Sequence, residues 1–280
     1  MDHITWFLVM IMLTPALLED INITSHPNFR LTVMLLCSFF IVINMPQLPQ
    51  FNFGNLNFIV NHTLFQIFFF SFSIVAVMNG QNMLDGVHGL SAVQGICVFL
   101  CILILGLHLN HLPYVLTSFV LVLLLISFLL FNYPVGKIFL GDLGSYFLAL
   151  LGSFIIIDIF AQNPQLPTWL AVIILFYPTF EVMFSIIRKF ISKKSPIYPD
   201  DKHLHSLIFN FFKNKRKKSP KISNILVMPV LILLWLSPIL FFIFSLRYSF
   251  FLTPSIFILA FIYLAYYFAF RKFNNGGQLR

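Results

Sequence analysis

The chain has 280 residues, of which 59% are hydrophobic and only 9% are charged, and its formal net charge is +8. A soluble domain carries roughly 25% charged residues, so this composition excludes a water-soluble globule. Disordered, collagen-like and disulfide-stapled classes are excluded as well, because Phe alone supplies 37 residues and only three are Cys. The simplest interpretation is one integral membrane domain over residues 1–280.

Nine apolar segments of 15 to 21 residues follow one another with short polar gaps between them. Backbone groups in lipid must be satisfied within the segment, so these segments are expected to be helices, and the alternating pattern of a membrane barrel is absent. The predicted fold class is therefore all-α, a polytopic bundle of about nine transmembrane helices. Their predicted ranges are 4–18, 31–47, 58–78, 90–107, 114–131, 146–161, 168–187, 225–245 and 250–270. No basic stretch precedes the first span, so a cleavable signal peptide is not expected.

The basic residues gather on one face if the loops alternate across the membrane. That face carries 16 of the 17 Lys and Arg residues, eleven of them between Arg188 and Lys221, whereas the opposite face has only Arg247. Short loops rich in Lys and Arg stay in the cytoplasm. We therefore expect the N-terminus outside, the C-terminus in the cytoplasm, and cytoplasmic loops at 19–30, 79–89, 132–145 and 188–224.

Six of the nine acidic residues fall in these same loops, although orientation does not require them there. They are Glu19, Asp20, Asp85, Asp142, Asp200 and Asp201. Together the four loops bring carboxylates, amides, histidines and glycines to one membrane face, which predicts a polar active site at the cytoplasmic interface. The basic surroundings favour an anionic substrate or anionic lipid headgroups.

Glu19 and Asp20 come directly after the first predicted span. Adjacent carboxylates at a membrane boundary repel each other unless a cation or a proton lies between them. This pair is therefore either part of a charged site or an ordinary solvated span end.

Residues 79–90 contain two Asn, an Asp, a His and three Gly. Asn79, Asn82 and Asp85 recur every three residues, so a continued helical turn would place them on one face. The glycines at 86 and 89 would let the backbone approach a ligand closely. The alternative is an Asn/Asp/Gly turn with solvated side chains.

Asp142 lies between two glycines just before the sixth predicted helix. Asp142 or Ser145 could simply cap that helix. The other interpretation is a magnesium ligand, since Mg²⁺ takes hard oxygen donors and leaves its remaining positions to water and phosphate.

The basic loop 188–224 carries a His-x-His motif, His203 and His205. Two prolines between residues 195 and 200 preclude one regular helix through this segment. The two histidines share a face only if the chain is extended, and a pair is too few for zinc, but imidazoles could hydrogen-bond phosphate or sugar oxygens. The basic run from Lys213 to Lys221 is most simply a solvated stretch resting on anionic lipid.

Two acidic residues lie inside predicted spans, where ionisable groups are costly and suggest a function. Asp158 is near the outer end of the sixth span and is expected to be wet. Glu181 is expected to face the bundle interior, toward the cytoplasmic end.

In this order, the motifs resemble the polyprenyl-phosphate N-acetylhexosamine-1-phosphate transferase family, glycosyltransferase family 4, which includes phospho-N-acetylmuramoyl-pentapeptide transferase. The family pattern Asn-x-x-Asn-x-x-Asp-Gly-x-x-Gly-Leu stands at 79–90, Phe-x-Gly-Asp-x-Gly-Ser at 139–145, and the Ser-Pro, Asp, His-x-His loop at 195–205. Glu19-Asp20 resembles the family's acidic pair. Residues 131–134 and 177–181 are similar to the O-antigen and lipopolysaccharide-initiating branch.

This resemblance implies transfer of N-acetylhexosamine 1-phosphate from a UDP-sugar to polyprenyl (undecaprenyl) phosphate, with release of UMP, at the start of lipid-linked cell-envelope polysaccharide synthesis. It implies Mg²⁺ as cofactor and UDP-N-acetylhexosamine, polyprenyl phosphate and membrane lipids as partners. The implied location is the bacterial cytoplasmic (inner) membrane, with the active site on the cytoplasmic face. No nucleic-acid partner is expected, and a homodimer is compatible with the sequence.

The resemblance also implies roles for individual residues. Asp142 and Asn82 are the implied metal ligands, and Asp20, with Glu19 beside it, would orient or deprotonate the lipid phosphate; Asp20, Glu19 and Asp142 are thus the predicted catalytic residues. Asp85 and His88 would lie near the nucleoside, and the His-x-His pair near the pyrophosphate or the sugar. The predicted substrate-binding residues are Asn79, Asp85, His88, His203 and His205.

The chain departs from the family pattern at Glu19, where an aspartate is usual, at Ile23, where a third acidic residue is common, and at His88, where Asp or Asn is frequent. Only one predicted span precedes Glu19 instead of three, so the sequence is expected to lack the family's N-terminal spans. One alternative is therefore a truncated, inactive family member. A second is a polytopic transporter or flippase for lipid-linked sugars, which predicts polar residues through the middle of the spans and related halves.

Overall fold

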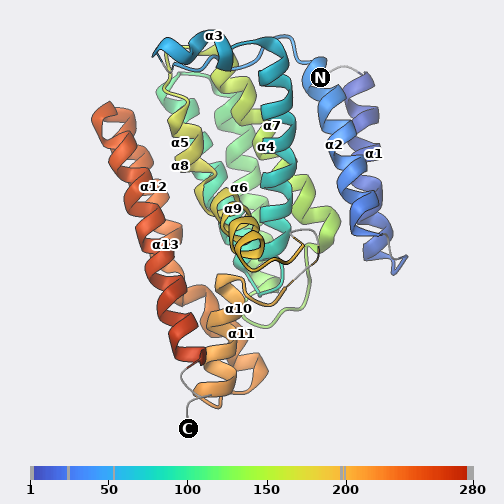
Figure 1. Cartoon of the computed structure of the whole chain (residues 1–280), viewed down its shortest axis with the longest axis vertical. Coiled ribbons are helices and arrows are strands. Elements are labelled where there is room, and N and C mark those ends of the chain that lie inside the picture. The colour runs from blue at the N-terminus through green and yellow to red at the C-terminus, as the bar shows by residue number, and fades with distance from the viewer. Residues whose placement is uncertain (1–2, 24–25, 53, 196–197, 199, 276–280) are drawn as a thin grey trace.

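The structure is a computed structural model that describes residues 3–23, 26–52, 54–195, 198 and 200–275. All regular elements within these residues are helical (Figure 1). The main helices are α1 (His3–Asp20), α2 (Pro27–Ile43), α4 (Thr63–Leu84), α5 (Leu90–His108), α6 (Leu112–Asn132), α7 (Gly141–Gln162), α8 (Trp169–Ile174), α9 (Phe176–Ile191), α10 (Leu204–Asn210), α11 (Pro220–Val230), α12 (Ile232–Arg247) and α13 (Leu252–Asn275). The shorter elements are η1 (Gly54–Leu56), α3 (Asn57–Val60), the π-helix η2 (Phe211–Lys215) and η3 (Ser249–Phe251). The predicted all-α class is confirmed.

Seven helices in the described chain are long and apolar enough to cross a membrane. They are His3–Asp20, Thr63–Leu84, Leu90–His108, Leu112–Asn132, Gly141–Gln162, Pro220–Arg247 and Ser249–Asn274. The apolar helix Pro27–Ile43 is shorter, and the predicted span 168–187 is divided between α8 and α9. The chain is thus a multi-pass membrane protein, as predicted, although helix length by itself supports seven spans rather than nine. The side of the membrane on which each end lies stays a prediction.

Helices α4 and α7 form the centre of the bundle (Figure 1). One face of α7, which includes Leu150, belongs to an apolar cluster shared with α1, α2 and α4. The opposite face, which includes Ile159, belongs to a second cluster shared with α5, α6 and the helices from α8 to α13. Helix α7 therefore joins the two halves of the bundle.

The segments that carry the sequence motifs reach one end of the bundle, here called the motif end. α1 ends there beside the start of α7, and α10 and α11 lie at the same end, whereas α3 lies at the opposite end (Figure 1). The prediction that these distant segments meet on one face is confirmed.

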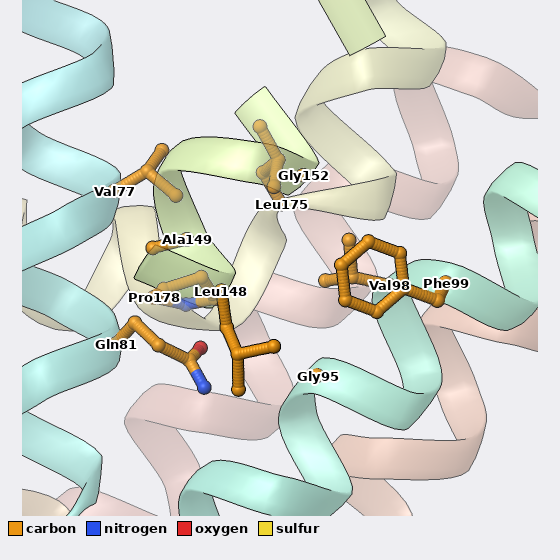
Figure 2. A pocket seen from close by; sticks show the side chains of 10 residues that line it. All are labelled: Val77, Gln81, Gly95, Val98, Phe99, Leu148, Ala149, Gly152, Leu175 and Pro178. Carbon is orange, nitrogen blue, oxygen red and sulfur yellow. The ribbon is translucent and has the colours of Figure 1, made fainter. Parts of the chain in front are cut away.

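A single residue, Leu175, separates α8 from α9. Pro178 has no N–H to donate, and its ring conflicts with the carbonyl four residues earlier, that of Ile174, so the helix cannot continue through this point. A cavity of about 10 Å³ lies at the break, lined by Gln81, Gly152 and apolar neighbours (Figure 2). That volume is about enough for one water molecule.

Two predicted loops are shorter than expected, because polar residues at their edges belong to helices. α4 continues to Leu84, so Asn79 and Asn82 lie on its last two turns, and α7 begins before Asp142. The predicted loop 188–224 contains α10, η2 and the start of α11. Pro196 and Pro199, on which the interruption of this loop was predicted, lie outside the described residues.

Gly80 is the point where α4 and α9 touch. A Cβ at Gly80 would overlap the carbonyl oxygen of Pro178, which belongs to the backbone and cannot turn aside as a side chain can. Gly152, in contrast, would place its Cβ 3.5 Å from a methyl group of Val98, an ordinary van der Waals contact.

We therefore predict that Gly80→Ala lowers the thermal unfolding midpoint of the detergent-solubilised protein, because overpacking of this kind costs about 1–3 kcal/mol. Gly152→Ala is the matched control and is expected to leave the midpoint nearly unchanged. Equal midpoints for the two variants would contradict the close approach of α4 and α9.

Candidate active site

Asp20, the last residue of α1, lies against the first turn of α7. Its carboxylate accepts hydrogen bonds from the backbone N–H of Asp142 at 2.9 Å and of Leu143 at 3.0 Å. The first amides of a helix have no intrahelical partner and carry partial positive charge, so a carboxylate is a favourable partner there. The cap of α7 thus comes from a distant helix, rather than from Asp142 or Ser145, the two local candidates.

Gly141 makes this approach possible. Its backbone has a φ of +69°, a conformation that side chains with a Cβ rarely adopt. A Cβ at Gly141 would also lie 2.7 Å from a carboxylate oxygen of Asp20. The glycine before Asp142 in the motif is therefore explained by the position of Asp20.

Arg30, in the first turn of α2, bridges two of the predicted catalytic carboxylates. One guanidinium nitrogen donates to Glu19 in a close contact and to Asp142 Oδ2 at 3.2 Å. The guanidinium also lies 5.8 Å from the ring centre of Tyr146. From the sequence, Arg30 was used only as one of the basic residues that predict the orientation of the chain in the membrane. The signal that could have identified it is that Arg30 is the single basic residue between the first two predicted spans.

Asn82 on α4 is hydrogen-bonded to α7 through both ends of its amide. Its Nδ2 donates to the hydroxyl of Tyr146 at 2.9 Å, and its Oδ1 accepts from Ser145 Oγ at 2.9 Å. A carbonyl oxygen has two lone pairs, so Oδ1 keeps capacity for one further partner. The predicted metal ligands Asn82 and Asp142 are thus brought together by the α4–α7 contact.

Asp85 is the C-cap residue of α4 and is partly buried. Burial and the nearby carboxylates of Asp142 and Asp20 raise the pKa of Asp85 to about 7, although a hydrogen bond with the backbone of Gly141 acts in the opposite direction. We call Glu19, Asp20, Asp85 and Asp142 the acidic cluster. Because gathered carboxylates repel one another, this cluster favours a cation or a shared proton.

The donor set of this cluster suits a hard cation that uses few protein ligands. Within the described residues, no group of three or more His, Cys, Asp or Glu side chains has the arrangement of a metal-binding cluster. Mg²⁺, however, is commonly held by one or two carboxylates together with phosphate oxygens and water. The Asp142 side chain is 31% exposed, so it can reach such a ligand, and the Asn82 carbonyl is a second oxygen donor.

The His-x-His motif forms a second group at the start of α10. The rings of His203 and His205 are parallel, with centroids 5.7 Å apart, and the backbone of His203 is extended, as the shared face required. His203 Nδ1 lies 2.9 Å from Glu181 Oε1, and its Nε2 lies 3.5 Å from Asp200 Oδ1. His203 is therefore held between two carboxylates.

Both carboxylates that hold His203 are themselves held by the protein. Glu181 is 1% exposed and accepts from the hydroxyl of Tyr263 at 2.7 Å, so the prediction that it faces the bundle interior is confirmed. Asp200 accepts from Arg188 at 2.7 and 3.0 Å. Partial burial tends to raise the pKa of Asp200, but Arg188 outweighs burial and lowers that pKa to about 2.

His205 has one ring nitrogen without a partner. It is 5% exposed, and its Nδ1 forms no hydrogen bond with a described residue. Burial lowers the pKa of His205 to about 4, although Glu181 opposes this, so the imidazole is neutral at physiological pH. A Cβ built on Gly86 would lie 3.9 Å from His205 Nε2, which places the ring beside the 79–90 motif.

Two predicted substrate-binding residues, Asn79 and His88, are bonded neither to the acidic cluster nor to the His-x-His group. The Asn79 amide donates to the carbonyl of Val75 in its own helix at 2.8 Å. His88 packs on the loop before α7, with Nδ1 3.3 Å from the carbonyl of Pro134 and its ring against Phe139. Their roles in substrate binding stay predictions.

Comparison with known proteins identifies the family of the chain. The profile of glycosyl transferase family 4 matches residues 3–160, more than half of the chain. The chain belongs to this family. The match contains α1, α4 and α7, which together supply the acidic cluster.

Three relatives of the chain are transferases. The probable undecaprenyl-phosphate N-acetylglucosaminyl 1-phosphate transferase of Bacillus subtilis is 30% identical over 139 residues, 49% of this chain and 39% of that protein. The undecaprenyl-phosphate alpha-N-acetylglucosaminyl 1-phosphate transferase of Thermotoga maritima is 31% identical over 137 residues, which are 49% of this chain and 41% of that protein. The phospho-N-acetylmuramoyl-pentapeptide-transferase of Leuconostoc citreum is 36% identical over 86 residues, which are 31% of this chain and 27% of that protein. The matched region thus spans about two fifths or less of these relatives.

The cap of α7 leads to a stability prediction. Asp20→Ala removes two hydrogen bonds from helix N-terminal amides to a charged carboxylate, which is expected to cost about 1–2 kcal/mol. The loss outweighs the relief of repulsion within the acidic cluster, because the repulsion acts over longer distances and is screened by 150 mM salt. The measurement is the thermal unfolding midpoint in detergent. Asp20→Asn, which keeps one acceptor oxygen, should fall in between, and Asp201→Ala, at an exposed site, should match the wild type.

The raised pKa of Asp85 leads to a pH prediction for the protein in Mg²⁺-free buffer. The folded state favours protonated Asp85, so the corresponding stability is present below the unfolded pKa, near 4, and is lost as the pH rises through about 7. Asp85→Asn stays neutral at every pH. The unfolding midpoint of the wild type should therefore decrease relative to that of Asp85→Asn between pH 4 and 8. A constant difference over this range would contradict the clustering of the carboxylates.

Proposed function

We propose that this protein transfers N-acetylhexosamine 1-phosphate from a UDP-sugar to polyprenyl phosphate, with release of UMP. The observation that carries the proposal is the acidic cluster at the N-terminus of α7, where carboxylates from α1, the end of α4 and α7 meet. Membership of glycosyl transferase family 4 and the activities of the relatives support it. The favoured donor is UDP-N-acetylglucosamine, because two of these relatives are N-acetylglucosaminyl 1-phosphate transferases.

Phosphoryl transfer requires positioning and charge stabilisation more than covalent chemistry by the protein. Asp142 and the Asn82 carbonyl are the residues that would hold Mg²⁺, which when bound neutralises charge on the diphosphate. Asp20 acts mainly as a positioning residue, because its carboxylate is occupied by the amides that fix the backbone of Asp142.

The remaining residues supply the contacts that a lipid phosphate and a sugar nucleotide need. Glu19 is held by Arg30, so an arriving lipid phosphate would compete with Glu19 for the guanidinium. Asp85 has a pKa of about 7 without a cation, and Mg²⁺ held at the neighbouring Asp142 would favour its charged form, which accepts hydrogen bonds from the substrate. The Nε2 atom of His205, rather than its enclosed Nδ1, is the ring nitrogen that could bond a sugar or phosphate oxygen, because it lies beside Gly86 of the 79–90 motif.

The proposed location is the cytoplasmic face of a bacterial inner membrane. The motif end carries nearly all of the basic residues of the chain, and the Lys- and Arg-rich side of a membrane protein is normally cytoplasmic. A nucleotide sugar and the polar head of a polyprenyl phosphate meet at this interface. The product would begin a lipid-linked cell-envelope polysaccharide, in the O-antigen and lipopolysaccharide branch of the family.

The test is incorporation of labelled UDP-N-acetylglucosamine into a lipid diphosphate by the purified chain with Mg²⁺ and undecaprenyl phosphate. Asp142→Asn is expected to reduce turnover by a factor of about 10² to 10³, since it removes a charged group at the transferring phosphate. Asp158→Asn is the matched control. That carboxylate bonds Tyr114 away from the motif end, so turnover should stay within about twofold.

Each competing function has its own outcome in this assay. A folded, monodisperse protein without turnover would favour the inactive family member. Transport of a lipid-linked sugar across vesicles, without formation of a lipid diphosphate, would favour the transporter. Equal turnover for Asp142→Asn and the wild type would remove Asp142 from the proposed metal site.

A further inference from the structure

A second polar pocket lies at the motif end, outside the acidic cluster. Its volume is about 220 Å³, and it is formed by the segment before α10, α10 itself, η2 and the last turn of α13. The side chains that line it come from Asp201, Lys202, Leu207, Asn210, Asn214, Lys215 and Asn274. None of these residues has a role in the proposed transfer reaction.

The lining has the chemistry of an anion site. Lys202 and Lys215 are exposed, and neither forms an ion pair within the described part of the chain. Asn210 and Asn214 add amide groups whose side chains form no hydrogen bond to a described residue, and a Lys ammonium and amide N–H groups are suitable donors to phosphate oxygens. Asn274 is different, since its Nδ2 already donates to the carbonyl of Leu207 at 2.9 Å.

The surroundings of the pocket indicate the level of lipid headgroups. Phe211 of η2 packs against Phe270 and Phe273 near the end of α13, with ring centroids 5.4 and 5.3 Å apart, and Phe273 is exposed. The guanidinium of Arg216 lies 5.4 Å from the Phe211 ring centre. Aromatic and basic side chains on one short amphipathic segment are typical of a membrane interface. A phosphate carried by a lipid is therefore the more accessible ligand.

We propose that this pocket binds the phosphate ester headgroup of an anionic membrane phospholipid. Lys202 and Lys215 hold the phosphate, the Asn210 and Asn214 amides donate to its oxygens, and the Asp201 carboxylate accepts from hydroxyl groups of the headgroup. A glycerol phosphate headgroup supplies both chemistries, with one phosphodiester charge and free hydroxyls. This site assigns a function to Lys215, which belongs to the basic stretch between α10 and α11 and has no role in the proposed reaction.

The test is binding of dihexanoyl phosphatidylglycerol to the full chain in neutral detergent, followed as the rise of the thermal unfolding midpoint with lipid concentration. Dihexanoyl phosphatidylcholine, whose headgroup has no net charge, is the reference lipid. The wild type should bind phosphatidylglycerol about tenfold more tightly than phosphatidylcholine. The double variant Lys202→Gln, Lys215→Gln should lose this preference, whereas Lys202→Arg, Lys215→Arg, which keeps both charges, should retain it.

The matched control is Lys218→Gln, Lys221→Gln, which removes the same charge from exposed positions that do not line the pocket. It should retain the preference within about twofold. An equal loss in this control would assign the effect to the general positive field and overturn the pocket. Inorganic phosphate that stabilises the wild type as strongly as the lipid, and displaces it, would overturn the lipid source in favour of a soluble phosphate.

Discussion

The structure depends on the contact between the Asp20 carboxylate and the amino end of α7. This contact ties the end of α1 to the first turn of α7 at the motif end, where α2 also reaches α7 through the ion pair of Arg30 with Asp142. It requires a residue without a Cβ at position 141, and it brings the neighbouring Glu19 and the Arg30 guanidinium to Asp142. The N-terminus of a helix favours bound anions. At α7 this position is taken by the Asp20 carboxylate of the chain itself, in the region proposed to bind the substrate phosphates.

The two polar groups at the motif end differ in how their charges are satisfied. In the acidic cluster, one arginine serves two carboxylates, and the pKa of Asp85 is raised by burial first and then by the neighbouring carboxylates of Asp142 and Asp20. Around His203, each carboxylate has its own donors, Tyr263 for Glu181 and Arg188 for Asp200. The first group can therefore gain free energy from an added cation, whereas the two carboxylates of the second group are already paired and hold His203 in place.

Much of this arrangement follows from the sequence, because apolar length predicts helices and the spacing of Asn82 and Asp85 predicts a shared face. The helix break at Leu175 was not predicted, since residues 168–187 were expected to form one span, although Pro178 within that span is the signal for it. The cap that Asp20 supplies to α7 cannot be predicted from the sequence, since it exists only when α1 approaches α7. Arg30 was missed for a related reason: a lone arginine near a span end satisfies the rule for membrane orientation without any further role. The ends of α4 and α7 were placed wrongly because their polar residues bond to a neighbouring helix rather than to water.

The contact of Gly80 with Pro178 has a mechanical consequence for the two polar groups. α4 carries Asn82 two residues beyond the contact, and α9 carries Glu181 three residues beyond it. Because backbone meets backbone at this point, the two helices cannot come closer together there. The contact therefore sets the smallest separation between the helix that carries Asn82 and the helix that carries Glu181, and so between the two polar groups.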